Sequence, residues 1–294
     1  YVAENGIPDV IHVHSLLYAG VLANEIFERY KIPFIVTEHS TAFARKLISP
    51  AGISLAKAAS LNASRRFAVS EAFANLLNEL LGHKGSPWME LPNIVNEKFL
   101  QANLEQERKP SEFRFVNVAF MNEKKKQSHI LGAFSHIKKA YSEARLTLAG
   151  DGPERKNLER LAVELGIHEA VKFTGLLTRD QVLVEIVRSD AFVLASSHET
   201  FGVVVIEALA LGKPVIATRC GGPESILREK DGILIPVDDV DALTDAMSQM
   251  ILSRGNYDSA EIRNACALRF SEAAVVSRLM KTYEETASNA ASSS

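Results

Sequence analysis

Short apolar runs alternate with longer stretches of helical periodicity along most of this sequence, and that alternation constrains the fold more than any other feature. Each predicted strand is followed by a predicted helix, as in a parallel sheet whose crossover helices cover both faces. From residue 113 onward the predicted strands are 115–121, 146–150, 171–174, 191–196, 214–218 and 233–237, and the predicted helices are 128–141, 153–165, 179–188, 202–211, 223–228 and 241–253. This pattern predicts a complete doubly wound α/β domain.

The N-terminal part of the chain shows the same alternation over fewer elements. Its predicted strands are 10–14, 34–38 and 66–70, and its predicted helices are 17–30, 54–62 and 71–81. These elements make about half of a second Rossmann-like domain. If that domain was once complete, about 60–90 residues of it are absent, at about 30 residues per β-α-β unit; the alternative is an unusually small first domain. Because the chain starts at Tyr1 rather than at a methionine, we expect this domain to be truncated.

The 294 residues fit two domains of about 150 residues each. A polar stretch at 101–110 interrupts the alternation and is the predicted linker, so we expect domains at 1–105 and 111–270. Two further helices, 258–270 and 272–286, close the chain, and 289–294 is expected to be a disordered polar tail.

The charge balance and the two cysteines exclude several classes of protein. Thirty-three basic against thirty-six acidic residues give a net charge of −3, which is unsuited to a nucleic-acid binder. The most apolar stretch, Val203–Ala217, is interrupted by Glu207 and Lys213 and is shorter than the roughly 20 residues of a membrane helix. Cys220 and Cys266 are too few for a disulfide framework or a zinc site, so a reducing, cytoplasmic location is expected.

Two acidic residues follow the predicted strand 191–196, Glu199 in the loop and Glu207 in the next helix, with seven residues between them. That helix opens at Phe201-Gly202, and only Thr200 stands where a side chain could cap it. Uncapped amides at a helix N-terminus form an anion site, and burial of Glu207 would call for a partner such as a ligand hydroxyl pair. The alternative is that Glu199 is solvated and Glu207 pairs with a basic residue.

Three other strand ends carry polar or glycine-rich segments. Lys124–Lys126 could hold a diphosphate, although such a run is usually a solvated face. Gly150-Asp151-Gly152 resembles the start of a dinucleotide fingerprint, but Arg155 stands where the third glycine belongs, which disfavours a dehydrogenase. Gly221-Gly222 is more readily explained by a tight turn than by ligand contact.

Three histidines lie in the predicted N-terminal sheet. His39 follows a strand and could bind a substrate or transfer a proton, while a structural role is an equal alternative. His12 and His14 flank Val13 and so point to one face of their strand. We expect His12 to be structural and leave the role of His14 open.

Taken together, these segments resemble a retaining glycosyltransferase of the GT-B fold, family 4, over nearly the whole chain. Glu199 and Glu207 match that family's E-x7-E motif, and this long motif region is specific, whereas the shorter matches are weak alone. The other matching segments, in order along the chain, are 9–14, 37–39, 92–93, 148–153, 173–175, 208–217 and 221–224. The resemblance implies two Rossmann-like domains and sugar transfer from a nucleotide-diphosphate sugar, UDP or GDP, with no metal and no further cofactor. The acceptor would be a glycan, a lipid-linked glycan or a small molecule, as in polysaccharide biosynthesis. Peripheral membrane contact stays open.

The resemblance also assigns roles to residues. Glu207 would bind the ribose, Glu199 would face the donor sugar, and Lys125 would stabilise the leaving diphosphate. His39 would reach the donor sugar from the first domain, and the helix 272–286 would return to that domain. The remaining predicted donor-binding residues are Phe201, Gly202, Val203 and Val204 at the phosphates and sugar, Gly175, Leu176 and Leu177 near the base, and Gly150.

One departure from the family weakens the resemblance at the diphosphate. The family has Gly-Arg five residues before its lysine, where this chain has Ala119-Phe120. Lys124 or Lys126 could compensate, but lysine lacks the planar fork for bidentate binding. Two alternatives within enzymes remain, a sugar-nucleotide epimerase and a phosphorylase. A non-catalytic nucleotide-sugar-binding module is a third, to which Phe120 and the truncated first domain lend weight.

Overall fold

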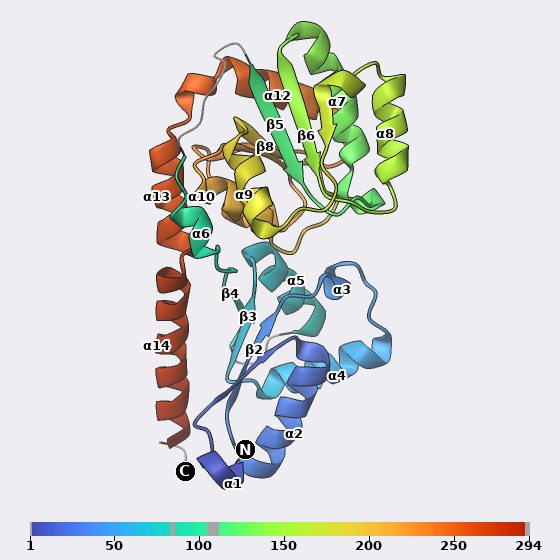
Figure 1. Ribbon diagram of the computed structural model, residues 1–294. Coiled ribbons are helices and arrows are strands. Elements are labelled where there is room, and N and C mark those ends of the chain that lie inside the picture. The colour runs from blue at the N-terminus through green and yellow to red at the C-terminus, as the bar shows by residue number, and fades with distance from the viewer. Residues whose placement is uncertain (1, 83–85, 105–111, 292–294) are drawn as a thin grey trace. The chain divides into compact units, whose positions relative to one another are not determined.

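The computed structural model describes residues 2–82, 86–104 and 112–291, and it divides into two compact units (Figure 1). Unit 1 comprises Tyr1–Ile94 and Glu272–Ser294, and unit 2 comprises Val95–Ser271. Most of the predicted linker, residues 105–110, lies outside the described residues. The chain divides before that stretch because Arg263 donates hydrogen bonds to the carbonyls of Leu100 and Ala102, which holds this segment to unit 2.

Unit 2 contains a six-stranded parallel sheet, so the predicted doubly wound domain is confirmed. Its strands are β5 (Phe113–Val118), β6 (Ala144–Ala149), β7 (Val171–Phe173), β8 (Ala191–Leu194), β9 (Val215–Thr218) and β10 (Gly232–Ile235). They are ordered β10-β9-β8-β5-β6-β7. The strand order reverses direction between β5 and β8, where open sheets of this kind bind ligands beyond the carboxyl ends of the strands.

Helices cover this sheet. Those on one side, α7, α8 and α12, share a single hydrophobic core with the strands, while α9 and α10 contact β5, β8 and β9 (Figure 1). The helices are α6 (Glu97–Leu100), α7 (Gln127–Ala140), α8 (Arg155–Glu164), α9 (Arg179–Val187), α10 (Val203–Ala210), α11 (Gly222–Ile226), α12 (Val240–Leu252) and α13 (Ser259–Phe270), with short 3-10 turns at Glu123–Lys125, His168–Ala170 and Arg254–Asn256.

Unit 1 contains a four-stranded parallel sheet ordered β1-β2-β3-β4. Its strands are β1 (Ile11–His14), β2 (Phe34–Glu38), β3 (Arg65–Ala68) and β4 (Trp88–Glu90). Before the last helix, its helical segments are α1 (Val2–Asn5), η1 (Leu16–Gly20), α2 (Val21–Tyr30), α3 (Thr41–Ala44), α4 (Pro50–Asn62) and α5 (Glu71–Leu81). The sequence did not predict β4, because three residues are too few to show a periodicity.

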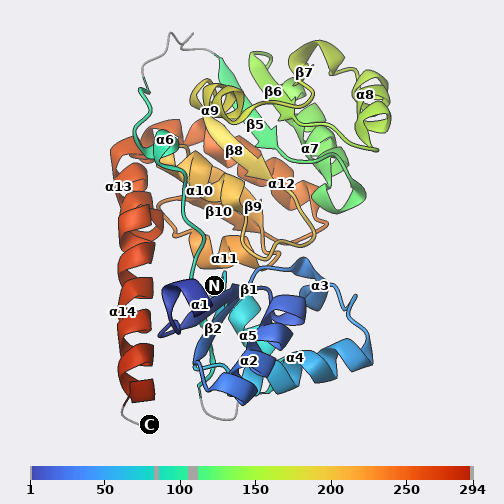
Figure 2. The same cartoon turned by 60° about the horizontal axis from the view of Figure 1, so that its bottom comes forward.

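The last helix, α14 (Glu272–Ala291), belongs to unit 1 (Figure 2). Val275 belongs to a buried cluster with Ile35 and Leu91, and Leu279 and Tyr283 pack against that cluster. The expectation of a disordered tail at 289–294 is wrong for 289–291, which continue this helix, and the last three residues lie outside the described part. Among the described helices, none is both long and apolar enough to cross a bilayer.

Candidate active site

Lys125 and Glu199 meet at the reversal point of the unit 2 sheet. Lys125 closes the 3-10 turn after β5, and Glu199 lies in the loop after β8, the strand that neighbours β5. The Lys125 Nζ forms an ion pair with the Glu199 Oε1, and both side chains are largely buried, with 16% and 12% of their surface exposed. The strand order therefore brings together two charged groups that lie 74 residues apart in sequence.

Backbone and serine hydrogen bonds fix this pair in place. The Ser196 hydroxyl donates to the Glu199 Oε1 at 2.7 Å, so that oxygen accepts from both a hydroxyl and an ammonium. The Ser197 amide donates to the Lys124 carbonyl at 2.8 Å, which joins the lysine turn to the acid loop. A group held by several hydrogen bonds is pre-organised for a ligand, because little further ordering is needed on binding.

The helix α10 begins beside this pair without a side-chain cap. Gly202 is its N-cap residue, with a left-handed φ of 102° that favours glycine. Within the described part of the chain, the amides of Gly202, Val203 and Val204 donate no hydrogen bond. These amides and the positive end of the helix dipole can bind an anion.

Glu207 lies inside α10 with its side chain fully buried. Its Oε1 pairs with the Nη2 of Arg179, the first residue of α9, while its Oε2 is buried without a hydrogen-bond partner among the described residues. Burial raises the pKa of the Glu207 carboxyl, and Arg179 partly opposes that shift. The basic partner that the sequence left as an alternative is therefore present, yet half of the carboxylate still lacks a partner.

Arg179 is a site residue that the sequence did not predict. Its guanidinium lies over the Phe99 ring at 5.2 Å and keeps about half of its surface, 54%, exposed. Ser196 was also missed. Neither residue stands in a distinctive motif; for Arg179, the available signal was a basic residue at the start of the helix that follows Gly175–Leu177.

The paired glycines after β9 position the acid loop. The Glu199 amide donates to the Cys220 carbonyl at 3.0 Å, and the Gly222 amide donates to the Glu199 carbonyl at 2.8 Å. A Cβ on Gly222 would lie 2.0 Å from the carbonyl oxygen of Phe201. Gly221-Gly222 therefore forms a turn, and the backbone hydrogen bonds of this turn also fix the position of Glu199.

We expect Gly222→Ala to displace this loop. The φ of Gly222 lies outside the left-handed region, so alanine can adopt its backbone conformation. Alanine is disfavoured there only because its Cβ would clash with the Phe201 backbone. Overpacking of this kind costs about 1–3 kcal/mol of unfolding free energy, and weaker nucleotide-sugar binding should accompany it. Thermal unfolding and calorimetric titration measure both effects. Gly255→Ala is the matched control, because no atom lies within 4 Å of a Cβ there. Equal behaviour of the two variants would contradict the positioning role.

The remaining predicted donor-binding residues lie at neighbouring strand ends. Gly150 and Gly175 pair through an isolated bridge, with the Gly150 amide 3.0 Å from the Gly175 carbonyl. A Cβ on Gly150 would lie 2.0 Å from the Ala119 carbonyl oxygen, so close backbone packing already explains this glycine. Leu176 is exposed and Leu177 half-buried.

The lysine run is divided among different roles. Lys126 forms an ion pair with Asp238 at 3.0 Å, so it does not replace the family's arginine in this arrangement. Phe120, which stands in place of that arginine, is 56% exposed. Among the described residues, the Lys124 side chain forms no hydrogen bond or ion pair. Lys125 alone of the three pairs with an acid of the predicted site.

In unit 1 the rings of the three histidines lie next to one another at the end of the sheet, with His14 between His12 and His39. The His12 ring bonds to the Tyr283 hydroxyl at 2.6 Å and the Thr37 hydroxyl at 2.8 Å, in agreement with a structural role. Burial, followed by repulsion from the neighbouring histidines, lowers the pKa of His12 to about 4. The His14 Nδ1 lies 2.9 Å from the His39 Nε2, and burial lowers the pKa of His39 as well. Repulsion from the neighbouring His14 adds to the lowering of the pKa of His39.

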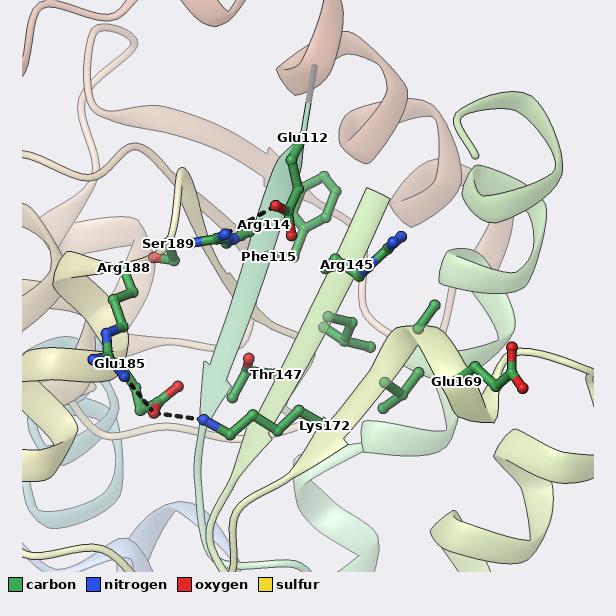
Figure 3. Close-up of a pocket in the computed structure, with 13 residues that line it drawn as sticks. Glu112, Arg114, Phe115, Arg145, Thr147, Glu169, Lys172, Glu185, Arg188 and Ser189 are labelled. Carbon is green, nitrogen blue, oxygen red and sulfur yellow. Dashed lines mark hydrogen bonds and ion pairs between the residues drawn. The ribbon is translucent and has the colours of Figure 1, made fainter. Parts of the chain in front are cut away.

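A separate cavity of about 270 Å³ lies at the amino ends of β5 and β6, and Figure 3 shows its lining. Its charges largely neutralise one another: Lys172 pairs with Glu185 at 2.7 Å and Arg114 with Glu112 at 2.8 Å (Figure 3). None of the predicted site residues lines it. Because ligands of such sheets bind at the opposite, carboxyl ends, we assign no activity to this cavity.

Two family models match the chain. The model described as glycosyl transferases group 1 matches residues 101–267, and the model of glycosyltransferase family 4 matches residues 2–99. The N-acetyl-alpha-D-glucosaminyl L-malate synthase of Bacillus anthracis is 29% identical over 261 residues, which cover 85% of this chain and 67% of that protein. The lipopolysaccharide core biosynthesis glycosyltransferase LpsE of Rhizobium meliloti is 37% identical over 107 residues, which cover 36% of this chain and only 31% of that protein.

Solved structures share the architecture at lower identity. Sucrose-phosphate synthase from Thermosynechococcus elongatus aligns with a TM-score of 0.77 at 21% identity, over 97% of this chain and 75% of that one. Anabaena HepE in complex with UDP aligns with a TM-score of 0.81 at 19% identity, over 94% of this chain and 79% of that one. At these identities the likeness establishes the fold.

Proposed function

Because this chain belongs to the glycosyl transferases group 1 of glycosyltransferase family 4 and has the GT-B fold, we propose that it transfers a sugar from a nucleotide-diphosphate donor to an acceptor hydroxyl, with retention at the anomeric carbon. The observation that carries the proposal is the contact of Lys125 with Glu199 beside the uncapped start of α10. That arrangement offers an ammonium and free amides to a diphosphate, and a carboxylate to the sugar next to it.

Negative charge grows on the nucleotide diphosphate as the bond to the sugar breaks. Groups that stabilise this charge more in the transition state than in the ground state accelerate the reaction. Lys125 and the amides of Val203 and Val204 serve this purpose, since their donors are already oriented. When a diphosphate binds, one N–H of the Lys125 ammonium keeps its contact with Glu199 and the other two donate to the phosphate oxygens.

Glu207 binds the nucleoside. Its Oε2 is buried without a partner, and burial of an unsatisfied carboxylate oxygen is costly. Two ribose hydroxyls would satisfy it, and Arg179 would keep the carboxyl ionised and oriented through the other oxygen. Gly175, Leu176 and Leu177 precede α9 and provide the adjoining surface for the base.

Glu199 holds the donor sugar and is not the nucleophile. Its Oε1 already accepts from Lys125 and Ser196, which lowers its nucleophilicity and leaves Oε2 for sugar hydroxyls. The acceptor oxygen attacks the anomeric carbon on the face from which the diphosphate departs. The departing phosphate oxygen takes the acceptor proton, so the products are the glycoside and the nucleoside diphosphate. His39 is assigned to the donor sugar.

A screen of UDP-, GDP- and ADP-sugars tests the proposal. Calorimetric titration should find one nucleotide class that binds to this chain, and the bound class is then supplied with candidate acceptors while release of the nucleoside diphosphate is followed. Binding of none of the three contradicts the proposed function. Release of a free, altered sugar without an acceptor would identify an epimerase instead.

A non-catalytic nucleotide-sugar-binding module is the second candidate. It is favoured by Phe120, an exposed apolar side chain where the family's arginine would contact the diphosphate. This candidate predicts donor binding without transfer or hydrolysis. Phe120→Arg separates the two: a gain in turnover at constant nucleotide specificity indicates an active site that Phe120 weakens.

A further inference from the structure

We propose that Phe99 is a positioning residue of the donor site: it holds the Arg179 guanidinium on one oxygen of Glu207 and so leaves the other oxygen to the nucleoside ribose. This inference rests on the proposed function, because it takes Glu207 to bind the ribose. All three residues belong to unit 2, with Phe99 in α6, Arg179 at the start of α9 and Glu207 in α10. Figure 1 shows α6 beside α10, which it contacts.

The contact between Arg179 and Glu207 uses only one of the two carboxylate oxygens. A guanidinium and a carboxylate frequently pair through two parallel hydrogen bonds, because the fork of donors matches the two oxygens. Here the Arg179 Nη2 donates to the Glu207 Oε1, and among the described residues nothing donates to Oε2, although that oxygen is buried. Because a buried oxygen without a partner is costly, another contact of the guanidinium has to favour the one-oxygen arrangement.

The Phe99 ring provides that second contact. The Arg179 guanidinium lies over the ring, 5.2 Å from its centroid, which is within the range of a cation–π interaction. The Arg179 side chain is half exposed, and a long side chain at the surface otherwise samples several rotamers. A flat ring beneath the guanidinium fixes its plane, and the plane decides which carboxylate oxygen the donors reach.

Hydrogen bonds to α13 hold α6 and its ring in place. The Val95 amide, just before α6, donates to the carbonyl of Phe270 at 2.8 Å. At the other end, Arg263 of α13 donates to the carbonyl of Leu100, the last residue of α6. The Phe99 side chain is itself buried, with 1% of its surface exposed. The ring is therefore a fixed support, and Arg179 is the partner that can move.

Removal of the ring should allow Arg179 to pair with both oxygens of Glu207. The buried Oε2 then gains a donor, which favours the two-oxygen arrangement. A ribose hydroxyl has to displace that donor before it can bind, so nucleotide affinity falls although Glu207 itself is unchanged. If Phe99 only filled space, its loss would lower stability without this effect on affinity.

Phe99→Leu tests the inference, with Phe134→Leu as its matched control. Phe134 is a fully buried phenylalanine of α7 in the core of the same unit, so both substitutions remove a ring from a packed interior and should lower the unfolding temperature. Calorimetry uses UDP, GDP or ADP, whichever the unaltered chain binds. We expect Phe99→Leu to weaken binding at least about fivefold and Phe134→Leu to change it by less than about twofold. Should Phe99→Leu fail to fold, Phe99→Met replaces it, because methionine adapts to irregular space without supplying a ring.

Arg179→Ala separates an effect through the arginine from a general loosening of the site. In that background the substitution of Phe99 should change nucleotide affinity by less than about twofold, since the guanidinium that the ring positions is absent. A crystal structure of the Phe99 variant without nucleotide gives a second readout that needs no ligand. We expect the Arg179 guanidinium there to donate to both oxygens of Glu207.

Three results would overturn the positioning role of Phe99. One is an equal loss of affinity with and without Arg179, another is an equal loss in Phe134→Leu, and the third is a variant crystal structure in which the guanidinium stays on Oε1 alone. An unaltered chain that binds none of the three nucleotides defeats the proposed function instead. The variant crystal structure then still decides whether Phe99 keeps Arg179 from the second oxygen of Glu207.

Discussion

Replacement of Lys125 by alanine should slow sugar transfer by about 10²–10³-fold, or about 2–4 kcal/mol of transition-state stabilisation. The reason is that negative charge on the diphosphate increases as the glycosidic bond breaks, so the ammonium contributes more to the transition state than to donor binding. Nucleotide-sugar affinity should therefore fall less than the rate. Single-turnover rates and calorimetric affinities, measured on the same preparations, give both quantities.

Lys124→Ala is the matched control for this variant. Its side chain forms no hydrogen bond or ion pair in the described part of the chain, and the substitution keeps the backbone carbonyl that accepts from Ser197. Lys125→Ala also leaves Glu199 with Ser196 as its remaining partner, so thermal unfolding must be compared as well. Undiminished turnover in Lys125→Ala would exclude the lysine from catalysis.

Glu207→Ala should weaken nucleotide binding by about 1.5–3 kcal/mol, the contribution of a hydrogen bond to a charged group. Titration with the nucleoside diphosphate alone measures this loss without the sugar. The free energy of unfolding should not fall in parallel with the nucleotide affinity. In the ligand-free protein the carboxylate has a buried oxygen without a partner, which is costly, and the substitution removes that cost. The Arg179 left behind is half exposed and can be solvated.

Glu207→Gln keeps the shape of the side chain and removes its charge, so it distinguishes ligand binding from packing. If Glu207 serves only as the structural partner of Arg179, both variants lose stability while nucleotide affinity is retained. If it binds ribose, Glu207→Gln loses affinity with little change in unfolding temperature. Unchanged affinity in both variants would remove Glu207 from the donor site.

The sequence predicted most of the regular structure because periodicity is a local property. Every predicted strand of unit 2 is present within a few residues, and Ser70 caps α5 as a serine at that place should, accepting from the Phe73 amide at 3.2 Å. Most of the failures are short elements, and one is the end of a long helix. β4 and α6 contain three and four residues, too few to repeat a pattern, and α14 continues through small polar residues that suggested a tail.

Residue order also showed which residues could carry chemistry, since E-x7-E and the lysine run are local patterns. Which of these residues meet depends on the tertiary structure. Lys125 reaches Glu199 because the strand order places β5 next to β8. Glu207 of α10 pairs with Arg179, which lies in a different helix, α9. Local patterns encode backbone conformation and burial, whereas contacts between distant segments depend on how the whole sheet is assembled.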